Sequence, residues 1–409
     1  MFLALLKTIA DEMTLDEINE EIDRLIGHRR LVWLLGAGAS FASGLPLMDG
    51  LTARVVDKLR ADKHTIKDVA GVEINTADFV HDVLCTIGGS CTVEQVLDHL
   101  ADYLGMARRV AAKTVRTPLG EIRYDPIERS RLAILHVIRE TIRYGYRHDT
   151  DPTKQHIGSP GSPIVDVRHH VKFVEALFGE VLAARFAASP VDIFTTNYDT
   201  LIEDALSLCS VPYADGFSGG AVAFWNPSAY LAKEMIRSRV YKLHGSVDWT
   251  ATPANRTIVR RRIGDAYPED AEDLLIYPQA SKYDLARREP FDTLFQCFRD
   301  SIGGREGRVL VVCGYGFGDE HINHDIQAAM GRDGSDLTLL AFAKSPAGPL
   351  SGWLTQSFGE RIYVLAEDGV YRATDPACRS GTAGPRDWWT FEGMTARLRN
   401  ARTTIGARA

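Results

Sequence analysis

The sequence predicts an α/β protein with a doubly wound, mostly parallel sheet and a large helical insertion. Short apolar runs typical of strands buried on both faces recur along the chain, and helical patterns separate most of them. Polar, glycine-bearing motifs follow several of these runs. With 409 residues, the chain is long enough for a complete α/β domain and a second unit of comparable size.

Composition and charge are those of a globular protein. Hydrophobic residues make up 45% and charged residues 25% of the chain, which argues against disordered and fibrous classes. The formal net charge of −7 argues against a protein that coats nucleic acid with positive charge. For the basic clusters at 108–109 and 260–262 and the arginine-bearing tail at 395–409, we therefore favour solvated surface over a contact with nucleic acid. The chain shows neither a signal-peptide pattern nor a long apolar run, so we expect a cytoplasmic protein without membrane contact.

A helix and a strand are expected first. Thr14 and Glu17 form a capping-box pattern, and an apolar stripe continues to Ile26, so residues 1–30 are expected to be an N-terminal helical segment. The run from Leu31 to Leu35 is apolar on both faces, as in a central parallel strand.

The remaining chain divides by pattern into helical and strand-rich parts. Helical patterns predominate over 56–187, which predicts a helical insertion domain whose last helices cover 127–144 and 171–187. Strands are expected afterwards at 191–194, 239–243, 308–313, 337–342 and 361–365. These patterns assign residues 31–55 and 188–370 to the doubly wound domain, and residues 371–409 to a C-terminal extension.

Two of the motifs at strand ends are rich in glycine. The run GAGAS at 36–40 follows the first strand, and GYGFGDEHIN at 314–323 follows the strand at 308–313. Glycines there let the backbone approach a phosphate, and the next helix offers its N-terminal N–H groups to the anion. The alternatives are a tight strand-to-helix turn for the first motif and a capped turn for the second, without a ligand.

The other two motifs carry polar side chains. TTNYD at 195–199 places hydroxyl, amide and carboxyl groups at a strand end, although a helix N-cap would explain the same residues. KLHGS at 242–246 places a histidine where it can transfer protons near neutral pH, although a single histidine is also compatible with a structural role. Because the carboxyl ends of parallel strands share one edge, we expect all four motifs to meet in one crevice.

The combination of GAGAS, TTNYD, KLHGS and GYGFGDEHIN resembles the sirtuin-like NAD-binding domain. It is most similar to the bacterial branch of antiphage defence systems, which includes the sirtuin subunit of sirtuin–HerA pairs. The resemblance implies a Rossmann-like fold that cleaves NAD to nicotinamide and ADP-ribose, and so depletes NAD in abortive infection. It also implies a homo-oligomer and a HerA-type hexameric ATPase as partner, through which any contact with nucleic acid would run.

The resemblance further implies roles for individual residues. Asn197 would hold the ribose or the attacking water, and His244 would be the general base toward a ribose hydroxyl. Asp199 would contact the nicotinamide carboxamide. The other residues expected to bind NAD are Gly36, Ala37, Gly38, Ser40, Thr195, Gly314 and Asp319.

Two departures from the deacylase sirtuins decide between enzyme classes. None of the six cysteines belongs to a C-x-x-C pair, so neither a zinc ribbon nor another metal site is expected. Thr196 stands where deacylases carry glutamine. We therefore favour an NAD glycohydrolase over a protein deacylase. The alternative from another class is a subunit that senses NAD or ADP-ribose, or serves as a scaffold, in a partner ATPase complex.

Overall fold

The computed structural model of the protein describes the residue ranges 15–28, 30–87, 91–149, 154–179, 190–232, 236–251, 258–261, 274–276, 289–304, 307–373 and 386–406. The predicted capping residue Thr14 lies outside these ranges, as do residues 180–187 of the helix expected over 171–187.

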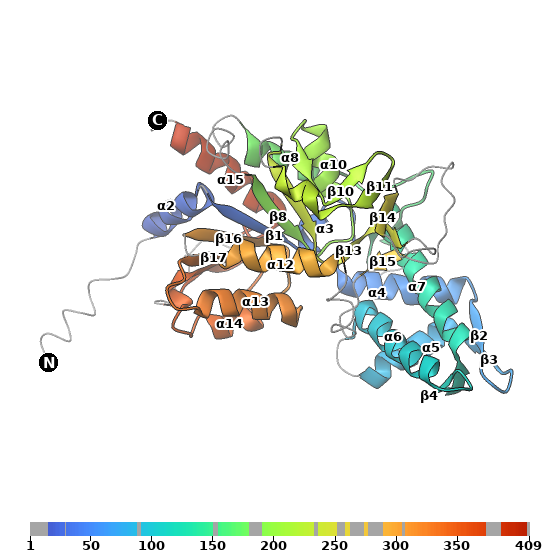
Figure 1. Ribbon diagram of the computed structural model, residues 1–409. Coiled ribbons are helices and arrows are strands. Elements are labelled where there is room, and N and C mark those ends of the chain that lie inside the picture. The colour runs from blue at the N-terminus through green and yellow to red at the C-terminus, as the bar shows by residue number, and fades with distance from the viewer. Residues whose placement is uncertain are drawn as a thin grey trace, which may run out of the picture.

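An eight-stranded sheet, here the central sheet, forms the middle of the molecule (Figure 1). Its order is β19-β18-β17-β16-β1-β8-β12-β9, and only β18 and β19 pair in the antiparallel direction. The strands are β1 (Leu31–Leu35), β8 (Val191–Thr195), β9 (Tyr213–Ala214), β12 (Ser238–Lys242), β16 (Arg308–Cys313), β17 (Leu337–Phe342), β18 (Ile362–Ala366) and β19 (Gly369–Tyr371). The predicted doubly wound, mostly parallel sheet is confirmed.

The strand order places the turning point of the sheet at β1. The chain passes from β1 to β8 and β12 on one side, and later returns to β16, β17 and β18 on the other side. In open α/β sheets, ligands bind at such a switch point, outside the carboxyl ends of the strands. The fold therefore marks the ends of β1, β8 and β16 as the place to look for a site.

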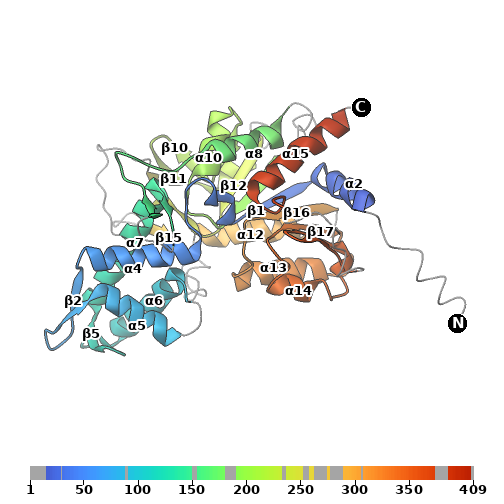
Figure 2. The same cartoon turned by 180° about the vertical axis from the view of Figure 1, so that it is seen from behind.

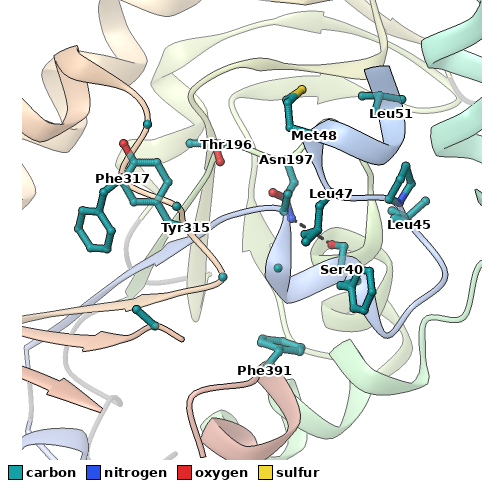
Figure 3. Close-up of a pocket in the computed structure, with 18 of the residues that line it drawn as sticks. Ser40, Leu45, Leu47, Met48, Leu51, Thr196, Asn197, Tyr315, Phe317 and Phe391 are labelled. Carbon is teal, nitrogen blue, oxygen red and sulfur yellow. Dashed lines mark hydrogen bonds between the residues drawn. The ribbon is translucent and has the colours of Figure 1, made fainter. Parts of the chain in front are cut away.

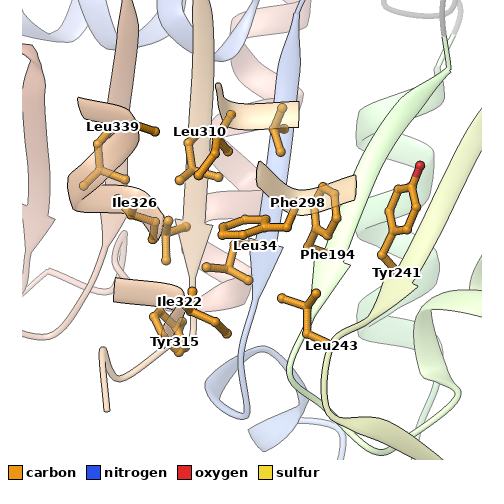
Figure 4. Close-up of a cluster of buried hydrophobic side chains, with 14 of the residues drawn as sticks. Leu34, Phe194, Tyr241, Leu243, Phe298, Leu310, Tyr315, Ile322, Ile326 and Leu339 are labelled. Atoms are coloured by element: carbon orange, nitrogen blue, oxygen red, sulfur yellow. The ribbon is translucent and has the colours of Figure 1, made fainter. Parts of the chain in front are cut away.

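Helices cover both faces of the central sheet (Figures 1 and 2). One face packs against α12 (Phe291–Ile302), α13 (Glu320–Gly331) and α14 (Pro349–Trp353). The other packs against α2 (Leu15–Ile26), α8 (Arg168–Phe178), α10 (Leu201–Leu208) and α15 (Phe391–Gly406). Successive strand residues serve opposite faces, so Leu34 belongs to the first core and Trp33 to the second. Figure 4 shows Phe298 of α12 beside Phe194 of β8, with ring centroids 5.0 Å apart.

Four helices form a third core, which Figures 1 and 2 show to one side of the central sheet. This helical unit contains α4 (Met48–Ala61), α5 (Thr76–Ile87), α6 (Val93–Arg109) and α7 (Tyr124–Tyr144). It also contains two hairpins, formed by β2 (Thr65–Lys67) with β3 (Glu73–Asn75) and by β4 (Thr114–Thr117) with β5 (Gly120–Arg123). Because α8 packs on the central sheet, the predicted insertion over 56–187 is divided between two cores.

A second, five-stranded antiparallel sheet was not predicted. Its order is β10-β11-β14-β13-β15, with β10 (Phe217–Gly219), β11 (Val222–Trp225), β13 (Gly245–Ala251), β14 (Ile258–Arg261) and β15 (Leu274–Ile276). The prediction that Arg260 is solvated surface is wrong, because its guanidinium forms an ion pair with Asp215 and lies 5.4 Å from the centroid of the Phe217 ring. The shorter described elements are α3 (Gly38–Phe41), β6 (Tyr146–Arg147), β7 (His156–Ile157), η2 (Pro227–Leu231) and η4 (Gly359–Arg361).

The loops after β1 and β16 touch along their backbones. The Gly38 N–H donates to the Gly314 carbonyl oxygen at 2.8 Å. A Cβ on Gly38 would lie 2.7 Å from Gly314 Cα, and a Cβ on Gly314 would lie 2.2 Å from Ala39 N. Gly314 also has a φ of +69°, which disfavours a side chain. These glycines are therefore required for the contact between the two loops themselves.

We predict that Gly314→Ala destabilises the protein strongly. The left-handed backbone costs about 1–2 kcal/mol for a residue with a side chain, and the overlap with Ala39 N raises the total loss of unfolding free energy above about 3 kcal/mol. Denaturant unfolding measures the loss. Gly316→Ala is the matched control, because no described atom lies within 4 Å of its added Cβ, and a change under about 1 kcal/mol is expected. Equal unfolding free energies for the two variants would contradict the requirement for glycine at position 314.

Candidate functional site

A cavity of about 810 Å³ opens at the carboxyl ends of the central strands. Loops after β1, β8, β12, β16 and β17 line it, and the helical unit and the start of α15 complete its wall. Figure 3 shows Asn197 near the middle of this wall, with Tyr315 and Phe317 on one side and Leu45, Leu47 and Leu51 on the other. The volume falls within the range of small-molecule sites, and the place is the switch point of the sheet.

The structure brings most of the predicted site residues together at this cavity. The wall includes Ala37, Gly38, Ser40, Asn197, Asp199, His244, Gly314 and Asp319. Gly36 and Thr195 lie behind it. The Cβ position of Gly36 is 2.5 Å from the Gly314 carbonyl oxygen, and the Thr195 hydroxyl accepts a hydrogen bond from the Asn197 N–H at 3.0 Å. These two residues shape the loops instead of facing the cavity.

Ser40, Asn197 and Asp199 form a buried chain of hydrogen bonds. Ser40 Oγ donates to Asp199 Oδ2 at 2.8 Å, and Asn197 Nδ2 donates to Ser40 Oγ at 3.0 Å. A serine hydroxyl has one hydrogen, so a serine that donates to the carboxylate can only accept from the amide. The carboxylate of Asp199 thus sets which way the amide of Asn197 points.

In this orientation of the amide, the side-chain oxygen of Asn197 is left without a hydrogen-bond donor among the described residues. Asn197 Oδ1 is buried and has no hydrogen-bond partner among the described residues. A buried acceptor without a partner costs free energy, and native structures rarely keep one without a role. The atom belongs to a residue that lines the cavity. A hydrogen-bond donor supplied by a ligand or its water would satisfy it.

His244 lies in the link between the two sheets, since β12 ends at Lys242 and β13 begins at Gly245. Its side chain is buried, and its Nε2 lies 3.0 Å from Asp319 Oδ2. When Asp319 is ionised, this bond requires Nε2 to carry a hydrogen, which leaves Nδ1 of a neutral ring as the base. The pairing shows that His244 has a carboxylate partner that orients its ring.

Asp319, which was predicted to bind NAD, has partners within the protein on both carboxylate oxygens. Its Oδ1 accepts hydrogen bonds from the N–H groups of His321 and Ile322 and so caps α13, while its Oδ2 faces His244. The N-terminus of this helix is therefore capped by the chain itself. Asp319 thus caps the start of α13 and also holds the histidine, while its contact with NAD stays a prediction.

The Asp199 carboxylate also accepts hydrogen bonds from two groups. Its Oδ1 accepts from the Leu201 N–H at 3.0 Å at the start of α10, and its Oδ2 accepts from Ser40. Lys242 donates to the Asp199 carbonyl oxygen, and its Nζ lies 3.5 Å from Glu203 Oε1. Burial raises the pKa of Glu203. The lysine at the end of β12 thus ties the loop after β8 in place.

A buried histidine that the motifs did not include completes the network. His170 of α8 lies 3.5 Å from Ser40 Oγ through Nε2, and 3.3 Å from Ser43 Oγ through Nδ1. Burial lowers the pKa of His170 to about 4, against the smaller opposing effect of Asp199, so the ring is neutral at pH 7. The sequence held a signal for it, because His170 shares the apolar stripe of α8 with Phe173, Val174 and Leu177.

The helical unit reaches the site through Tyr198. This residue stands between Asn197 and Asp199, and its hydroxyl donates to Glu94 Oε1 near the start of α6. Burial, with a smaller contribution from Glu94, raises the pKa of Tyr198 well above its usual value, so it remains a donor. Tyr198 also belongs to the core of the helical unit. The insertion therefore supports the loop that carries the candidate catalytic amide.

Comparison with known proteins gives one match to a family model. Residues 191–361 match the SIR2-like domain. This SIR2-like region contains the motifs at 195–199, 242–246 and 314–323, and the predicted resemblance to sirtuin-like domains is confirmed for this part of the chain. No curated protein matches the sequence.

Solved structures of Sir2 homologues are similar to the chain at low identity. One, in complex with NAD, has a TM-score of 0.40 and 10% identity, and the match covers 94% of each chain. A mutant homologue in complex with ADP-ribose has a TM-score of 0.38 and 12% identity, covering 95% of this chain and 98% of its own. A second mutant in complex with ADP-ribose gives 0.37 and 11%, with the same coverage.

Within the described ranges, no group of three or more histidine, cysteine, aspartate or glutamate side chains is arranged to hold a metal ion. Likewise, none of the helices in the described part of the chain has the length and apolar character needed to cross a membrane.

We predict that His170 makes the protein less stable in mild acid. Its pKa is about 4 when folded and near 6.5 when unfolded, so the unfolded chain binds more protons between these values. The contribution to unfolding free energy is complete above about pH 6.5, and about 3 kcal/mol is lost as the pH falls toward 4. Denaturant unfolding from pH 7 to pH 4.5 measures the slope. In His170→Gln the slope should be shallower, and parallel curves for both proteins would contradict the assignment.

Proposed function

We propose that the protein is an NAD glycohydrolase that breaks the bond between nicotinamide and ribose and releases nicotinamide and ADP-ribose. The observation that carries this proposal is the buried Asn197 Oδ1, without a partner among the described residues at the wall of the cavity. The SIR2-like match over 191–361 and the four motifs support NAD as the substrate.

The cavity has the features that a dinucleotide needs. Its volume of about 810 Å³ lies in the upper part of the range for small-molecule sites. Gly316 and Gly318 line it and have open space at their Cβ positions, so a ligand can come close to their backbone. We place the nicotinamide ribose beside Asn197 and His244, and the diphosphate along the loops after β1 and β16.

Breaking the bond between nicotinamide and ribose does not require protonation of the leaving group. Nicotinamide is bound to the ribose as a cationic pyridinium and departs as a neutral molecule, so no general acid is required. The barrier comes from the positive charge that develops on the ribose. Fixed dipoles and a nearby negative charge lower such a barrier most effectively in a water-poor site.

His244 is suited to supply that negative charge. A neutral imidazole with Nε2 bonded to Asp319 keeps Nδ1 as a proton acceptor. Acting on a ribose hydroxyl, it would increase the negative charge on that oxygen, beside the cationic carbon. Asp319 would stabilise the imidazolium that forms, as an orienting carboxylate does in other acid–base pairs.

Asn197 is suited to position the nucleophile. Its Oδ1 can accept a hydrogen bond from a water molecule or a ribose hydroxyl, because its Nδ2 is occupied by Ser40. A water held in this way at near-attack distance gains the rate advantage of a preformed geometry. Addition of that water to the ribose carbon, with loss of one proton, gives ADP-ribose.

The motif resemblance also suggests the setting. Its similarity to the antiphage defence branch supports NAD depletion in the cytoplasm as an abortive-infection response. It further supports a homo-oligomer that works with a HerA-type ATPase.

We predict that Asn197→Ala and His244→Ala each lower the rate of nicotinamide release by about 10²–10⁴-fold, the usual effect of removing a positioned acid or base. The measurement is nicotinamide release from NAD by the purified full chain, and unfolding curves verify that each variant is folded. His136→Ala, an exposed histidine on α7, is the matched control and should keep the wild-type rate. Full activity in either site variant would contradict the mechanism. Calorimetric binding of NAD by the wild type without nicotinamide release would favour the sensing subunit instead.

A further prediction concerns the direction of the hydrogen-bond chain. In Asp199→Asn, the new amide can donate to Ser40, which frees the serine hydrogen for Asn197 Oδ1 and turns the amide around. The kcat for nicotinamide release should fall about 10–100-fold, while the fold is kept, because the new side-chain oxygen can still accept from Leu201 N–H. Asp49→Asn removes the same charge from the cavity wall without touching Asn197, and it is the control. A similar loss in both variants would show that charge alone matters.

A further inference from the structure

The segment from β16 to β17 has the architecture of a nucleotide-binding βαβ unit. Strand β16 leads into the glycine-bearing loop 314–318, helix α13 follows, and β17 runs parallel beside β16. In such units the glycines adjoin the phosphates, and the end of the second strand recognises the ribose of the adenosine. A carboxylate there binds the 2′-hydroxyl of NAD, whereas a basic residue accommodates the 2′-phosphate of NADP.

The residues that follow β17 carry no carboxylate. Phe342, Ala343, Lys344 and Ser345 line the cavity at this strand end. Lys344 is the only lysine or arginine among the described lining residues. Its ammonium group forms no ion pair with a residue that the structure describes. The strand end therefore offers a cation and a hydroxyl where an NAD-selective site would carry an acid.

The order of the strand ends matches the order of groups in a dinucleotide. Asn197 follows β8, the glycines of the GAGAS loop follow β1, the second glycine loop follows β16, and Lys344 follows β17. Three strand spacings separate β8 from β17, about 14 Å across the sheet. A substrate with its nicotinamide ribose at Asn197 would thus extend across the glycine loops toward Lys344.

The carboxylates at this side of the cavity already have partners. Asp319 is paired with His244, and Glu392 Oε1 lies 3.1 Å from His169 Nδ1. Lys344 is exposed, and its carbonyl oxygen accepts a hydrogen bond from the Glu367 N–H at 3.1 Å, which fixes the backbone at the strand end. Its side chain is thus the group of this wall best placed to meet an anion.

We propose that Lys344, with the Ser345 hydroxyl, binds the 2′-phosphate of a phosphorylated dinucleotide, so that the protein cleaves NADP as well as NAD. This inference rests on the proposed NAD glycohydrolase function and specifies its substrate class. Release of nicotinamide from NADP needs no further reactant besides water, and its other product is 2′-phospho-ADP-ribose.

The test compares kcat/KM for NADP and NAD, measured as nicotinamide release by the purified full chain. The wild type should cleave both substrates. Lys344→Ala should lower the NADP-to-NAD ratio of kcat/KM about tenfold, as expected for the loss of one charged hydrogen bond, and Lys344→Glu should lower it about 100-fold or more. The backbone bond to Glu367 survives both substitutions. Lys172→Ala and Lys172→Glu change an exposed lysine of α8 outside the cavity wall and should leave the ratio unchanged.

Two results would overturn the proposal. One is a wild type that cleaves NAD and leaves NADP intact, and the other is an unchanged ratio in both Lys344 variants. If neither dinucleotide is cleaved, the proposed glycohydrolase function fails, and calorimetric titration with 2′-phospho-ADP-ribose and with ADP-ribose decides the role of Lys344. Tighter binding of the phosphorylated ligand that is lost in Lys344→Ala would support the lysine, and equal affinities would reject it.

Discussion

The backbone contact between the loops after β1 and β16 determines where the other site residues can lie. Gly38 and Gly314 approach so closely that a Cβ on either would overlap the backbone of the other loop. This contact joins the two strands that meet at the switch point, and it sets the direction in which each loop leaves the sheet. Ser40 follows directly on one side and the second glycine loop on the other. The glycines that resemble a ligand-binding motif thus have an internal steric reason to be there.

Next to this contact lies a short, buried chain of hydrogen bonds with a fixed direction. The Asp199 carboxylate accepts the hydrogen of Ser40, Ser40 must accept from Asn197, and the amide oxygen is turned to the cavity wall. His170 can only donate to Ser40, because the serine hydrogen is already used, so its other nitrogen accepts from Ser43. One carboxylate that accepts the serine hydrogen therefore fixes the donor and acceptor roles of four neighbours. Removing one member of such a network leaves a buried polar partner unsatisfied.

The sequence predicted six of the eight strands of the central sheet because they are buried on both faces and carry apolar runs, as at 309–313 of β16 and 339–342 of β17. The short edge strands β9 and β19 were not predicted. It also predicted that the polar motifs would converge, since parallel strands end at one edge. It did not predict the small antiparallel sheet, whose strands are short and partly polar, as in β10 with Phe217–Gly219. It could not identify Glu94 as the partner of Tyr198, because helical periodicity indicates a buried face and not what that face meets.

The sequence assigned residues 371–409 to a C-terminal extension without placing it, and in the structure α15 packs against α2 and α8, and its Phe391 lines the cavity. Its residues Met394 and Leu398 belong to the same core as Trp33 of β1. The sequence held a signal for a buried face, because Phe391, Met394, Leu398 and Ala401 recur at helical spacing. Periodicity does not indicate which surface such a face meets, and long-range packing makes this helix part of the wall.

The position of β1 between β8 and β16 has a consequence for synthesis on the ribosome. An early strand acquires its second neighbour only after the whole helical unit, β8, β12 and the small sheet have been translated. Until Arg308–Cys313 emerges, one edge of β1 has no hydrogen-bonding partner from its own chain, and the GAGAS loop lacks the surface that shapes it. A nascent chain can therefore complete its helical unit early, while the crevice itself assembles late. Any chemistry that needs the complete crevice would in this way be withheld from unfinished chains by topology alone.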